Sequence, residues 1–371
     1  MLASVVRRQI GNQQSQVPRN GARRAIATGR PWVPIERLPK QLLCVPLVLH
    51  WMLLACRYRS LTLPSAINPA IETGGLAGES KSAALAQIGA AFDRFVAPWR
   101  VVEPGGDAVA VRHAAGFAYP LIVKPDIGWC GYGVRRVNED AELLAYAAAF
   151  PRDGRMILQE LMTAPHEAGL FYVREPGAAC GSLAGVAVRH TPHVTGDGVR
   201  SVRALIAAGP RTARHATTYM GTVAGDILDS VPAAGERVVL TTIASLRVGA
   251  RYQDATAQAT PALTAAVDAM ARAMPQFHLG RFDVRFESLA GLRRGEFRVI
   301  EVNGAGSEAI QFWDPALTLR VAFAGVFAKQ AQLFRLGAAM RARGVRPVGV
   351  MALSRAWLRQ RRLIRAYPAS N

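Results

Sequence analysis

Lysine is nearly absent from this sequence, whose 371 residues contain forty-one arginines and only four lysines, Lys40, Lys81, Lys124 and Lys329. Cysteine is scarce too. The four cysteines stand apart from one another, which argues against a disulfide framework or a zinc cluster and fits a reducing compartment. Neither GxGxxG nor GxxxxGK[ST] occurs, so the sequence indicates neither a Rossmann nor a P-loop nucleotide site.

Acidic residues are also few, 26 against 45 basic ones, which gives the chain a net charge of +19. The first 60 residues hold ten of the basic residues and a single acid, Glu36. A second basic run of five arginines lies between Arg355 and Arg365. Basic tails of this kind are most often solvated, or lie without specificity against anionic lipid or RNA. We therefore predict no specific nucleic-acid partner.

The first 78 residues precede the regular pattern. Residues 1–35 are acid-free and aperiodic, which predicts a disordered basic tail. Residues 36–78 contain the apolar block LLCVPLVLHWMLLAC at 42–56, which is shorter than the ~20 residues that a spanning helix needs. We expect a helix that packs against the domain, with a helix lying in a membrane interface as the alternative. The protein is accordingly expected to be cytoplasmic, with peripheral membrane contact through residues 42–56 left open.

From residue 79 onward, helical and strand patterns alternate without a strict rhythm. Helices are predicted over 79–95, 139–150 and 261–274. Strands are predicted over 120–125, 156–161, 169–175, 183–190, 280–287 and 296–303, the last two forming a hairpin around residues 288–295. This mixture predicts an α+β fold rather than a doubly wound sheet. Residues 336–371 are expected to form a separate basic C-terminal segment.

The stretch YPLIVKPDIGWCGYGV, residues 119–134, places Lys124 at the end of an apolar strand. Lysine is a slim point charge that suits a single phosphate oxygen, whereas arginine is a planar fork. The glycines that follow, Gly128, Gly131 and Gly133, let backbone N–H groups come close to an anion. The stretch therefore suggests a phosphate site, although glycine-rich turns are common in any protein.

The predicted hairpin carries oxygen ligands. Glu301 and Asn303 are two residues apart on one strand and so share a face, and Asp283 can face them from the partner strand. Two carboxylates and an amide oxygen form a hard, incomplete set that suits Mg²⁺, which completes its octahedron with water and phosphate. The plain alternative is a solvated strand face. Glu160 and Glu167 could likewise meet a purine and a ribose, or be surface acids.

Four separated elements occur in an order that resembles the ATP-grasp superfamily: ESK at 79–81, the 119–134 stretch, LQELMTAPHE at 158–167, and the 280–309 hairpin with its glycine loop. The last element is similar to D-alanine–D-alanine ligases. The resemblance covers residues 79–335 and implies an ATP-grasp domain, in which two α+β subdomains clamp ATP. The stretch ahead of the first lysine departs from those ligases, and no clear counterpart exists for the residues that recognise their amino-acid substrates.

The resemblance implies roles for individual residues. It assigns nucleotide contacts to Lys81, Lys124, Gly128, Gly131, Gly133, Glu160, Leu161, Met162, Thr163 and Glu167. Within that set the lysines would contact phosphates, the glycines would form a flexible lid, residues 160–163 would read adenine and Glu167 would bind ribose. Asp283, Glu301 and Asn303 would hold one or two Mg²⁺ ions, with Mn²⁺ as a substitute. Lys124 and Arg281 would be catalytic, Arg281 by steadying the charge on the transferring phosphoryl group.

The implied activity is an ATP-dependent ligase that joins a small-molecule carboxylate to an amine, or to a thiol, through an acylphosphate. The alternative is an ATP-grasp kinase or nucleotide-binding protein docked on membrane or nucleic acid. The stretch HVTGDGVRSVRALI at 193–206 resembles a loop of cyanophycin synthetase, although Asp197 fits an ordinary tight turn equally well. Arg189, His193 and Arg200 could face phosphate or an acidic substrate, and Ser307 and Glu308 could contact the acceptor. Asp314 and Pro315 are expected to begin a helix.

Overall fold

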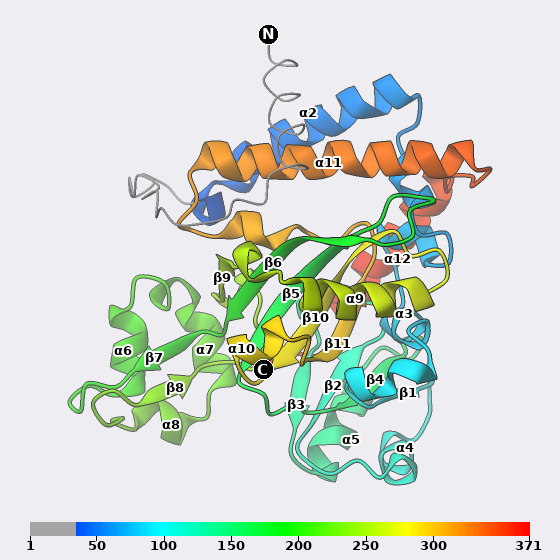
Figure 1. Ribbon diagram of the computed structural model, residues 1–371. Helices are drawn as coiled ribbons and strands as arrows, with labels where there is room; N and C mark the ends of the chain where they lie inside the picture. The colour runs from blue at the N-terminus through cyan, green and yellow to red at the C-terminus, as the bar shows by residue number, and fades with distance from the viewer. Residues whose placement is uncertain (1–34) are drawn as a thin grey trace. The chain divides into compact units, whose positions relative to one another are not determined.

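The computed structural model describes residues 35–371, and the predicted basic tail at 1–35 lies almost wholly outside this range. These described residues belong to one compact unit. The predicted α+β class is confirmed, because two larger antiparallel sheets and a small two-stranded sheet are each accompanied by helices (Figure 1). Short 3₁₀ turns punctuate the chain: η1 Ile35–Arg37, η2 Leu63–Ala66, η3 Glu72–Gly75, η4 Ala90–Phe95, η5 Ala213–His215, η6 Leu246–Val248, η7 Thr256–Gln258 and η8 Ile310–Trp313.

The smaller sheet has four strands in the order β1 (Trp99–Val102), β4 (Met156–Glu160), β2 (Leu121–Pro125) and β3 (Arg135–Val137). Helices α4 (Ala108–Ala115) and α5 (Asp140–Ala149) pack on it (Figure 1). Asp107 caps α4 by accepting from the N–H groups of the first turn, and Gly116 ends that helix in the left-handed conformation. Leu121 and Val123 of β2 are fully buried against α5, which leaves Lys124 to point away from the helices.

The larger sheet has five antiparallel strands in the order β11 (Arg298–Asn303), β10 (Leu279–Phe286), β5 (His166–Val173), β6 (Ser182–His190) and β9 (Arg251–Asp254). Helix α9 (Pro261–Ala273) covers one face, and α10 (Leu289–Arg293) lies in the connection between β10 and β11. The β10 sequence alternates arginine and aspartate with Phe282, Val284 and Phe286, all three of which are buried under α9. The alternate charged residues therefore face the opposite side, toward the smaller sheet.

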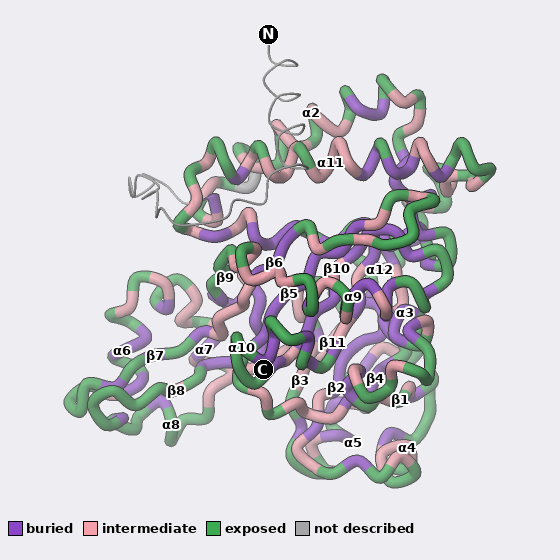
Figure 2. The backbone as a smooth tube through the Cα atoms, in the orientation of Figure 1, coloured by how far each residue is buried: buried purple, intermediate pink, exposed green. Residues whose placement is uncertain are grey.

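A separate two-stranded sheet pairs β7 (His193–Thr195) with β8 (Arg237–Val239), and α6 (Val202–Ala208), α7 (Ala216–Thr222) and α8 (Gly225–Asp229) pack beside it. Helix α2 (Lys40–Tyr58) lies alongside α11 (Leu319–Ala342), where Trp51 meets Phe334 edge-on with ring centroids 4.9 Å apart (Figure 1). Helix α12 (Val350–Ala366) follows α11, and the short helix α3 (Lys81–Ala86) precedes the smaller sheet. Figure 2 shows how much of α2 is exposed.

Most predicted elements are confirmed, including the helices at 139–150 and 261–274 and the hairpin around residues 288–295. The single helix predicted over 79–95 is wrong: it divides into α3 and η4, because Gly89 takes a φ of +80° between them. The helix predicted to begin at Asp314 instead begins at Leu319, capped by Thr318. Asp314 accepts from the N–H groups of Asp254 and Ala316.

Two predicted boundaries also fall differently in the structure. The apolar block forms a helix of 19 residues, longer than the 42–56 block, so that α2 spans about 28 Å. Among residues 35–371 it is the one helix that is long and apolar enough, by length and composition, to cross a membrane. Only 6% of its apolar stretch Gln41–Tyr58 is buried. The boundary predicted between the ATP-grasp domain and the basic C-terminal segment, at residues 335 and 336, lies inside the continuous helix α11.

Candidate active site

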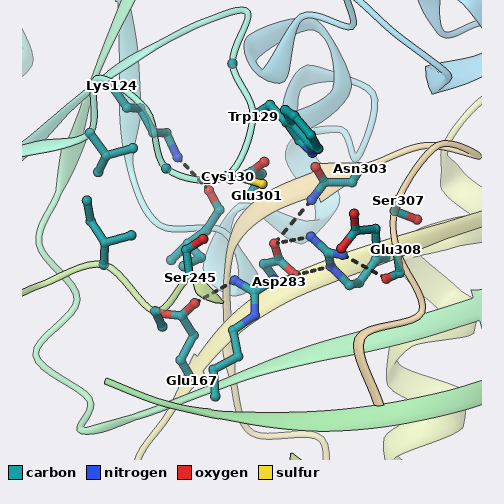
Figure 3. Close-up of a pocket in the computed structure, with 18 of the residues that line it drawn as sticks. Lys124, Trp129, Cys130, Glu167, Ser245, Asp283, Glu301, Asn303, Ser307 and Glu308 are labelled. Carbon is teal, nitrogen blue, oxygen red and sulfur yellow. Dashed lines mark hydrogen bonds and ion pairs between the residues drawn. The ribbon is translucent and has the colours of Figure 1, made fainter. Parts of the chain in front are cut away.

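A cavity of about 390 Å³ lies between the two sheets (Figure 3). Its walls come from β2 and β4 of the smaller sheet and from β5, β6, β10 and β11 of the larger one, together with the glycine loop. The volume is within the range of about 300–1,000 Å³ that small-molecule sites occupy. Most of the predicted site residues line it: Lys124, Gly128, Gly131, Glu160, Leu161, Met162, Glu167, Arg281, Asp283, Glu301 and Asn303. Lys81, Gly133 and Thr163 do not.

The β10–β11 ribbon presents four polar side chains on one face. In its register Asp283 lies opposite Glu301, and Arg281 lies opposite Asn303, so all four point toward the cavity. The Asn303 amide donates to Asp283 at 3.2 Å, and Arg281 donates to both Asp283 oxygens at 2.7 and 3.1 Å (Figure 3). The prediction that Glu301 and Asn303 share one face of their strand is therefore confirmed.

A β-bulge links this ribbon to the smaller sheet. The register shifts after Asp283, since Val284 pairs with Val299 and leaves Ile300 without a partner residue. The Ile300 carbonyl accepts a hydrogen bond from the Lys124 ammonium at 2.8 Å, and Gln159 on β4 accepts a second one at 2.7 Å. Burial lowers the pKa of Lys124 to about 8, although the charge of Glu301 acts in the opposite direction.

Lys81 is held at the start of α3 by the end of β2. Asp126 accepts from the Ser80 hydroxyl at 2.7 Å and from the Ser82 N–H at 2.8 Å, and its own carbonyl accepts from the Lys81 N–H. The Lys81 ammonium then donates to the Gly128 carbonyl at 3.2 Å and lies 3.7 Å from the Glu301 carboxylate. Lys81 therefore links the glycine loop to Glu301, one of the predicted metal ligands, although Lys81 does not itself line the cavity.

A buried charge network crosses the larger sheet below these groups. Arg189 on β6 bridges Glu167 and Asp283, at 2.8 Å to each, and Arg285 contacts Glu167 at 3.2 Å. Burial favours the neutral form of every member, but Arg189 and Arg281 together hold the pKa of Asp283 below its usual range. Likewise, Asp283 and Glu167 raise the pKa of Arg189 despite its burial. Asp283, Arg189 and Arg281 are therefore charged at neutral pH.

The donor chemistry of the ribbon fits a hard cation. Within residues 35–371 no group of three or more His, Cys, Asp or Glu side chains could hold a metal ion. Asp283, Glu301 and Asn303 supply two carboxylates and an amide on one face, an incomplete oxygen set. Such a set suits Mg²⁺, which takes its remaining ligands from water and phosphate. It would not serve zinc, which prefers nitrogen or sulfur.

The glycine loop at 128–133 is tied to residues remote in sequence. Arg247 donates to the Cys130 carbonyl at 3.0 Å and to the Gly131 carbonyl at 3.1 Å, and its guanidinium lies 4.3 Å from the centroid of the Tyr132 ring. The Ser370 hydroxyl also donates to the Gly131 carbonyl, at 2.9 Å, and accepts from the Gly133 N–H. The loop therefore lines the cavity and is held in place by Arg247 and Ser370.

Residues 370 and 371 were not predicted to approach the site. Asn371 accepts from the Arg136 N–H at 2.8 Å, and its backbone carbonyl accepts from the Thr242 hydroxyl at 2.8 Å. These two contacts join β3 of the smaller sheet to the segment before η6. No local sequence pattern predicts these contacts, because Arg136 and Thr242 each lie more than 120 residues from Asn371 in the chain.

Two further charged residues beside the cavity were missed. Glu79 accepts from the Gly304 N–H at 2.9 Å, and burial raises its pKa to about 7. Lys329 on α11 donates to the Ser307 carbonyl and lies 5.5 Å from the centroid of the Phe171 ring, and burial lowers its pKa to about 8. The scarcity of lysine could have drawn attention to Lys329, since Lys81, Lys124 and Lys329 are three of only four lysines in the chain.

The remaining sequence candidates divide into two groups. Arg189, Ser307 and Glu308 line the cavity, and the Ser307 hydroxyl is buried without a hydrogen-bond partner among the described residues. His193 lies on β7 and Arg200 in the turn that follows, and neither lines the cavity. Asp197 accepts from the backbone N–H groups of residues 199 and 200 and from the Arg200 side chain, which is the tight-turn arrangement.

No family model and no curated protein matches this chain. Solved structures do match, including a bifunctional glutathione synthetase from Pasteurella multocida, at 16% identity over 67% of this chain and 37% of that one, with a TM-score of 0.35. A D-alanine–D-alanine ligase from Bacillus anthracis matches at 14% identity over 74% of this chain and 70% of that one, with a TM-score of 0.41. The D-cycloserine synthetase DcsG matches at 19% identity over 72% and 70%, with a TM-score of 0.38. All three TM-scores lie below 0.5, so the functional conclusion rests on the geometry of the site.

Proposed function

We propose that this protein is an ATP-grasp ligase that uses ATP to join a small-molecule carboxylate to an amine through an acylphosphate. One observation carries the proposal. Two ammonium groups from the first part of the chain meet the late ribbon at one cavity, which Lys124 lines and Lys81 adjoins: Lys81 lies 3.7 Å from Glu301 and Lys124 lies 2.8 Å from the Ile300 carbonyl. These residues lie more than 170 positions apart in the chain. Cations on one side and oxygen ligands on the other are what a metal-bound triphosphate requires.

The nucleotide would lie with its phosphates between Lys124 and the glycine loop. The end of β4 and the following residues, Glu160 to Met162, line the neighbouring wall and would contact adenine. Their extended backbone offers N–H and C=O groups to the edge of the base. Glu167 already accepts from Arg189 and forms an ion pair with Arg285, and its remaining lone pairs would accept from ribose hydroxyls.

In the first step, an oxygen of the substrate carboxylate attacks the γ-phosphorus while the bond to the ADP oxygen breaks. Arg281 and Arg189 lie beside this position and would neutralise charge on the transferring phosphoryl group without moving a proton. Asp283, Glu301 and Asn303 would hold Mg²⁺, which supplies charge neutralisation to the phosphate oxygens. The chain's own contribution is mainly positioning, because phosphoryl transfer needs little covalent help.

In the second step, the amine attacks the acylphosphate carbonyl, the C–O bond to phosphate breaks, and the proton lost by the amine passes to the departing phosphate. Ser307 and Glu308 line the cavity beyond Asn303 and would contact the acceptor. A buried hydroxyl without a partner is unusual in a folded protein, so the Ser307 hydroxyl suits a polar group of the substrate. The glycine loop would exclude water, which would otherwise hydrolyse the acylphosphate.

Hydroxylamine provides the direct test, because it replaces the amine and captures an acylphosphate as a hydroxamate. Purified protein would be incubated with Mg²⁺, ATP, hydroxylamine and a panel of carboxylates, and both ADP and hydroxamate would be measured. A ligase gives both products in equal amounts. ADP formed with the carboxylate and unchanged by any amine would instead indicate a kinase. Nucleotide binding without ADP release across the panel would indicate a binding protein and contradict the proposal.

A matched pair of variants tests the role of the ribbon. Arg281→Ala removes a group that faces the cavity, whereas Arg298→Ala removes an exposed arginine from the partner strand of the same ribbon. We expect the first change to lower kcat at least a hundredfold, as for other oriented groups that stabilise transition-state charge by ~3 kcal/mol. The second should leave kcat within about twofold, because exposed substitutions contribute little. Equal losses in both variants would contradict the assignment of Arg281.

A further inference from the structure

A second cavity, also of about 390 Å³, lies between α2 and α12. Its walls are mostly apolar: Trp51 comes from α2, Leu61 from the turn after it, and Val350 and Leu353 from the first turn of α12. No charged side chain lines it. An apolar cavity of this size gains most from a hydrocarbon occupant, because burial of apolar surface is favourable and burial of unpaired polar groups is not.

The second cavity adjoins the candidate active site. Leu76, Ala77 and Trp357 line both cavities, so they form a shared wall. On the far side of that wall the chain continues into Glu79 and Lys81, at the phosphate end of the active site. A ligand with a chain in the second cavity could therefore place its polar end among the cations of the first.

Helix α2 carries an unusual apolar stripe next to the second cavity. Six side chains at helical spacing are each between 46% and 69% exposed: Leu42, Val45, Val48, Leu49, Met52 and Leu53. The opposite face, with Leu54 and Ala55, packs on Phe334 of α11. A soluble monomer rarely exposes a contiguous row of this kind, which marks an interaction surface. The helix contains no acid, and the exposed Arg57 and Arg59 lie at its end.

The charge around this stripe indicates its partner. Arg57 and Arg59 supply positive charge at the end of α2 itself. The exposed arginines of α12 lie further off, since Arg362 pairs with Asp153 beside the smaller sheet. A helix that pairs an exposed apolar stripe with flanking basic groups is suited to the boundary between acyl chains and anionic headgroups. A folded protein partner would need acids to match these arginines as well as an apolar groove, whereas an anionic bilayer offers both features everywhere on its surface.

We propose that the second cavity binds the hydrocarbon chain of an amphiphilic carboxylate, which the enzyme takes from an anionic lipid surface on which the apolar stripe of α2 rests. This inference rests on the proposed ligase function, because it names the class of acid that the ligase activates. The carboxylate reaches the active site past Leu76 and Ala77, where Lys81 and the arginines attract it. The chain remains in the second cavity, so hydrocarbon length contributes to affinity rather than to the chemical step.

Binding can be measured without turnover. A long-chain carboxylate that carries bromine along its chain should quench Trp51 and Trp357, because both line the second cavity. Ser354→Phe places a bulky ring in the cavity from an exposed position, whereas Leu358→Phe alters an exposed residue of the same helix that lines neither cavity. We expect saturable quenching, weakened at least tenfold by Ser354→Phe and unchanged by Leu358→Phe. Quenching that is equal in both variants would overturn the subsite.

Turnover then separates the two proposals. With a series of carboxylates, KM should fall about fourfold for each methylene added until the cavity is filled, with kcat nearly constant. Ser354→Phe should remove this dependence. Saturable quenching with no ADP formed from any carboxylate would retain the subsite and refute the ligase. ADP formed equally well from short and long acids, insensitive to Ser354→Phe, would retain the ligase and refute the subsite.

The lipid surface has its own test, in which the full chain is sedimented with vesicles that contain anionic phospholipid. Leu49→Glu combined with Leu53→Glu places two charges in the exposed stripe, and Leu144→Glu is the matched control, since it is 53% exposed on α5. We expect the wild type and the control to sediment with the vesicles and the double variant to remain in solution. A wild-type protein that remains in solution, or a double variant that still sediments, would overturn this part of the proposal.

Discussion

The lowered pKa of Lys124 predicts that ATP binding weakens in mild alkali. A free lysine side chain keeps its proton to well above pH 10, but burial lowers the pKa of Lys124 to about 8. Lys124 already donates to Gln159 and to the Ile300 carbonyl, so only the ammonium, with its three N–H groups, can also donate to a phosphate oxygen. The triphosphate therefore has to bind the protonated fraction of the protein.

The size of the effect follows from that fraction. With a pKa of about 8, roughly nine-tenths of the protein is protonated at pH 7 and roughly one-tenth at pH 9, and the apparent dissociation constant is the intrinsic one divided by this fraction. Affinity for ATP should accordingly fall about tenfold between pH 7 and pH 9. The direction is informative, because ATP itself gains no proton over this range and would not by itself bind more weakly.

The assay is isothermal titration calorimetry with ATP and saturating Mg²⁺ at pH 7, 8 and 9, at constant ionic strength. Lys124→Arg is the matched variant, since a guanidinium keeps its proton throughout this range. We expect the variant to bind more weakly at pH 7, because a planar fork replaces a point charge, but with an affinity that is independent of pH. The reasoning is refuted if the wild type shows no decline, or if Lys124→Arg declines as steeply as the wild type.

Three further predictions concern the same site. Asp283→Asn leaves Arg189 and Arg281 without their shared carboxylate, so the free energy of unfolding should fall by about 3–5 kcal/mol. ADP release should fall at least a hundredfold, because Asp283 would hold Mg²⁺; wild-type activity would exclude the role given to Asp283. Deletion of residues 368–371 should raise KM for ATP severalfold with little change in melting temperature, and an unchanged KM would show that these residues do not position the glycine loop. Gly131→Ala should lower the free energy of unfolding by about 1 kcal/mol or more, measured by urea denaturation, because Gly131 has a φ of +72° and a Cβ would lie 2.6 Å from Ile243. An unaltered urea midpoint would contradict that strain.

The sequence predicts this site well where local periodicity decides the geometry. Alternation along β10 and β11 is enough to place Asp283, Glu301 and Asn303 on one face, because side chains of a strand alternate by two. The position of Lys124 at the end of the apolar strand β2 likewise predicts where its charge lies. In each case a short sequence determines which face the side chain occupies, and the structure agrees.

The missed features depend on contacts between residues that are distant in sequence. The bulge at Ile300 presents a carbonyl to Lys124, and nothing in the sequence RVIEVN marks it. Arg189 becomes a partner of Asp283 only because β5 lies between β6 and β10 in the sheet. The Ser370 contacts arise from a chain that returns across more than 230 residues. Such arrangements follow from tertiary packing, which a local pattern does not encode.

The use of lysine in an arginine-rich chain now has a physical explanation. Lys81, Lys124 and Lys329 each donate to one backbone carbonyl in a loop or bulge beside the cavity, those of Gly128, Ile300 and Ser307 respectively. A guanidinium spreads five donors over a plane, and in so confined a position most of them would be buried without partners. An ammonium on a flexible stem satisfies the carbonyl with one donor and keeps the others for a phosphate or carboxylate oxygen. At exposed positions elsewhere in the chain, where the geometry is not restricted, arginine supplies positive charge equally well. Lysine occurs where a slim cation must contact the protein and the substrate together.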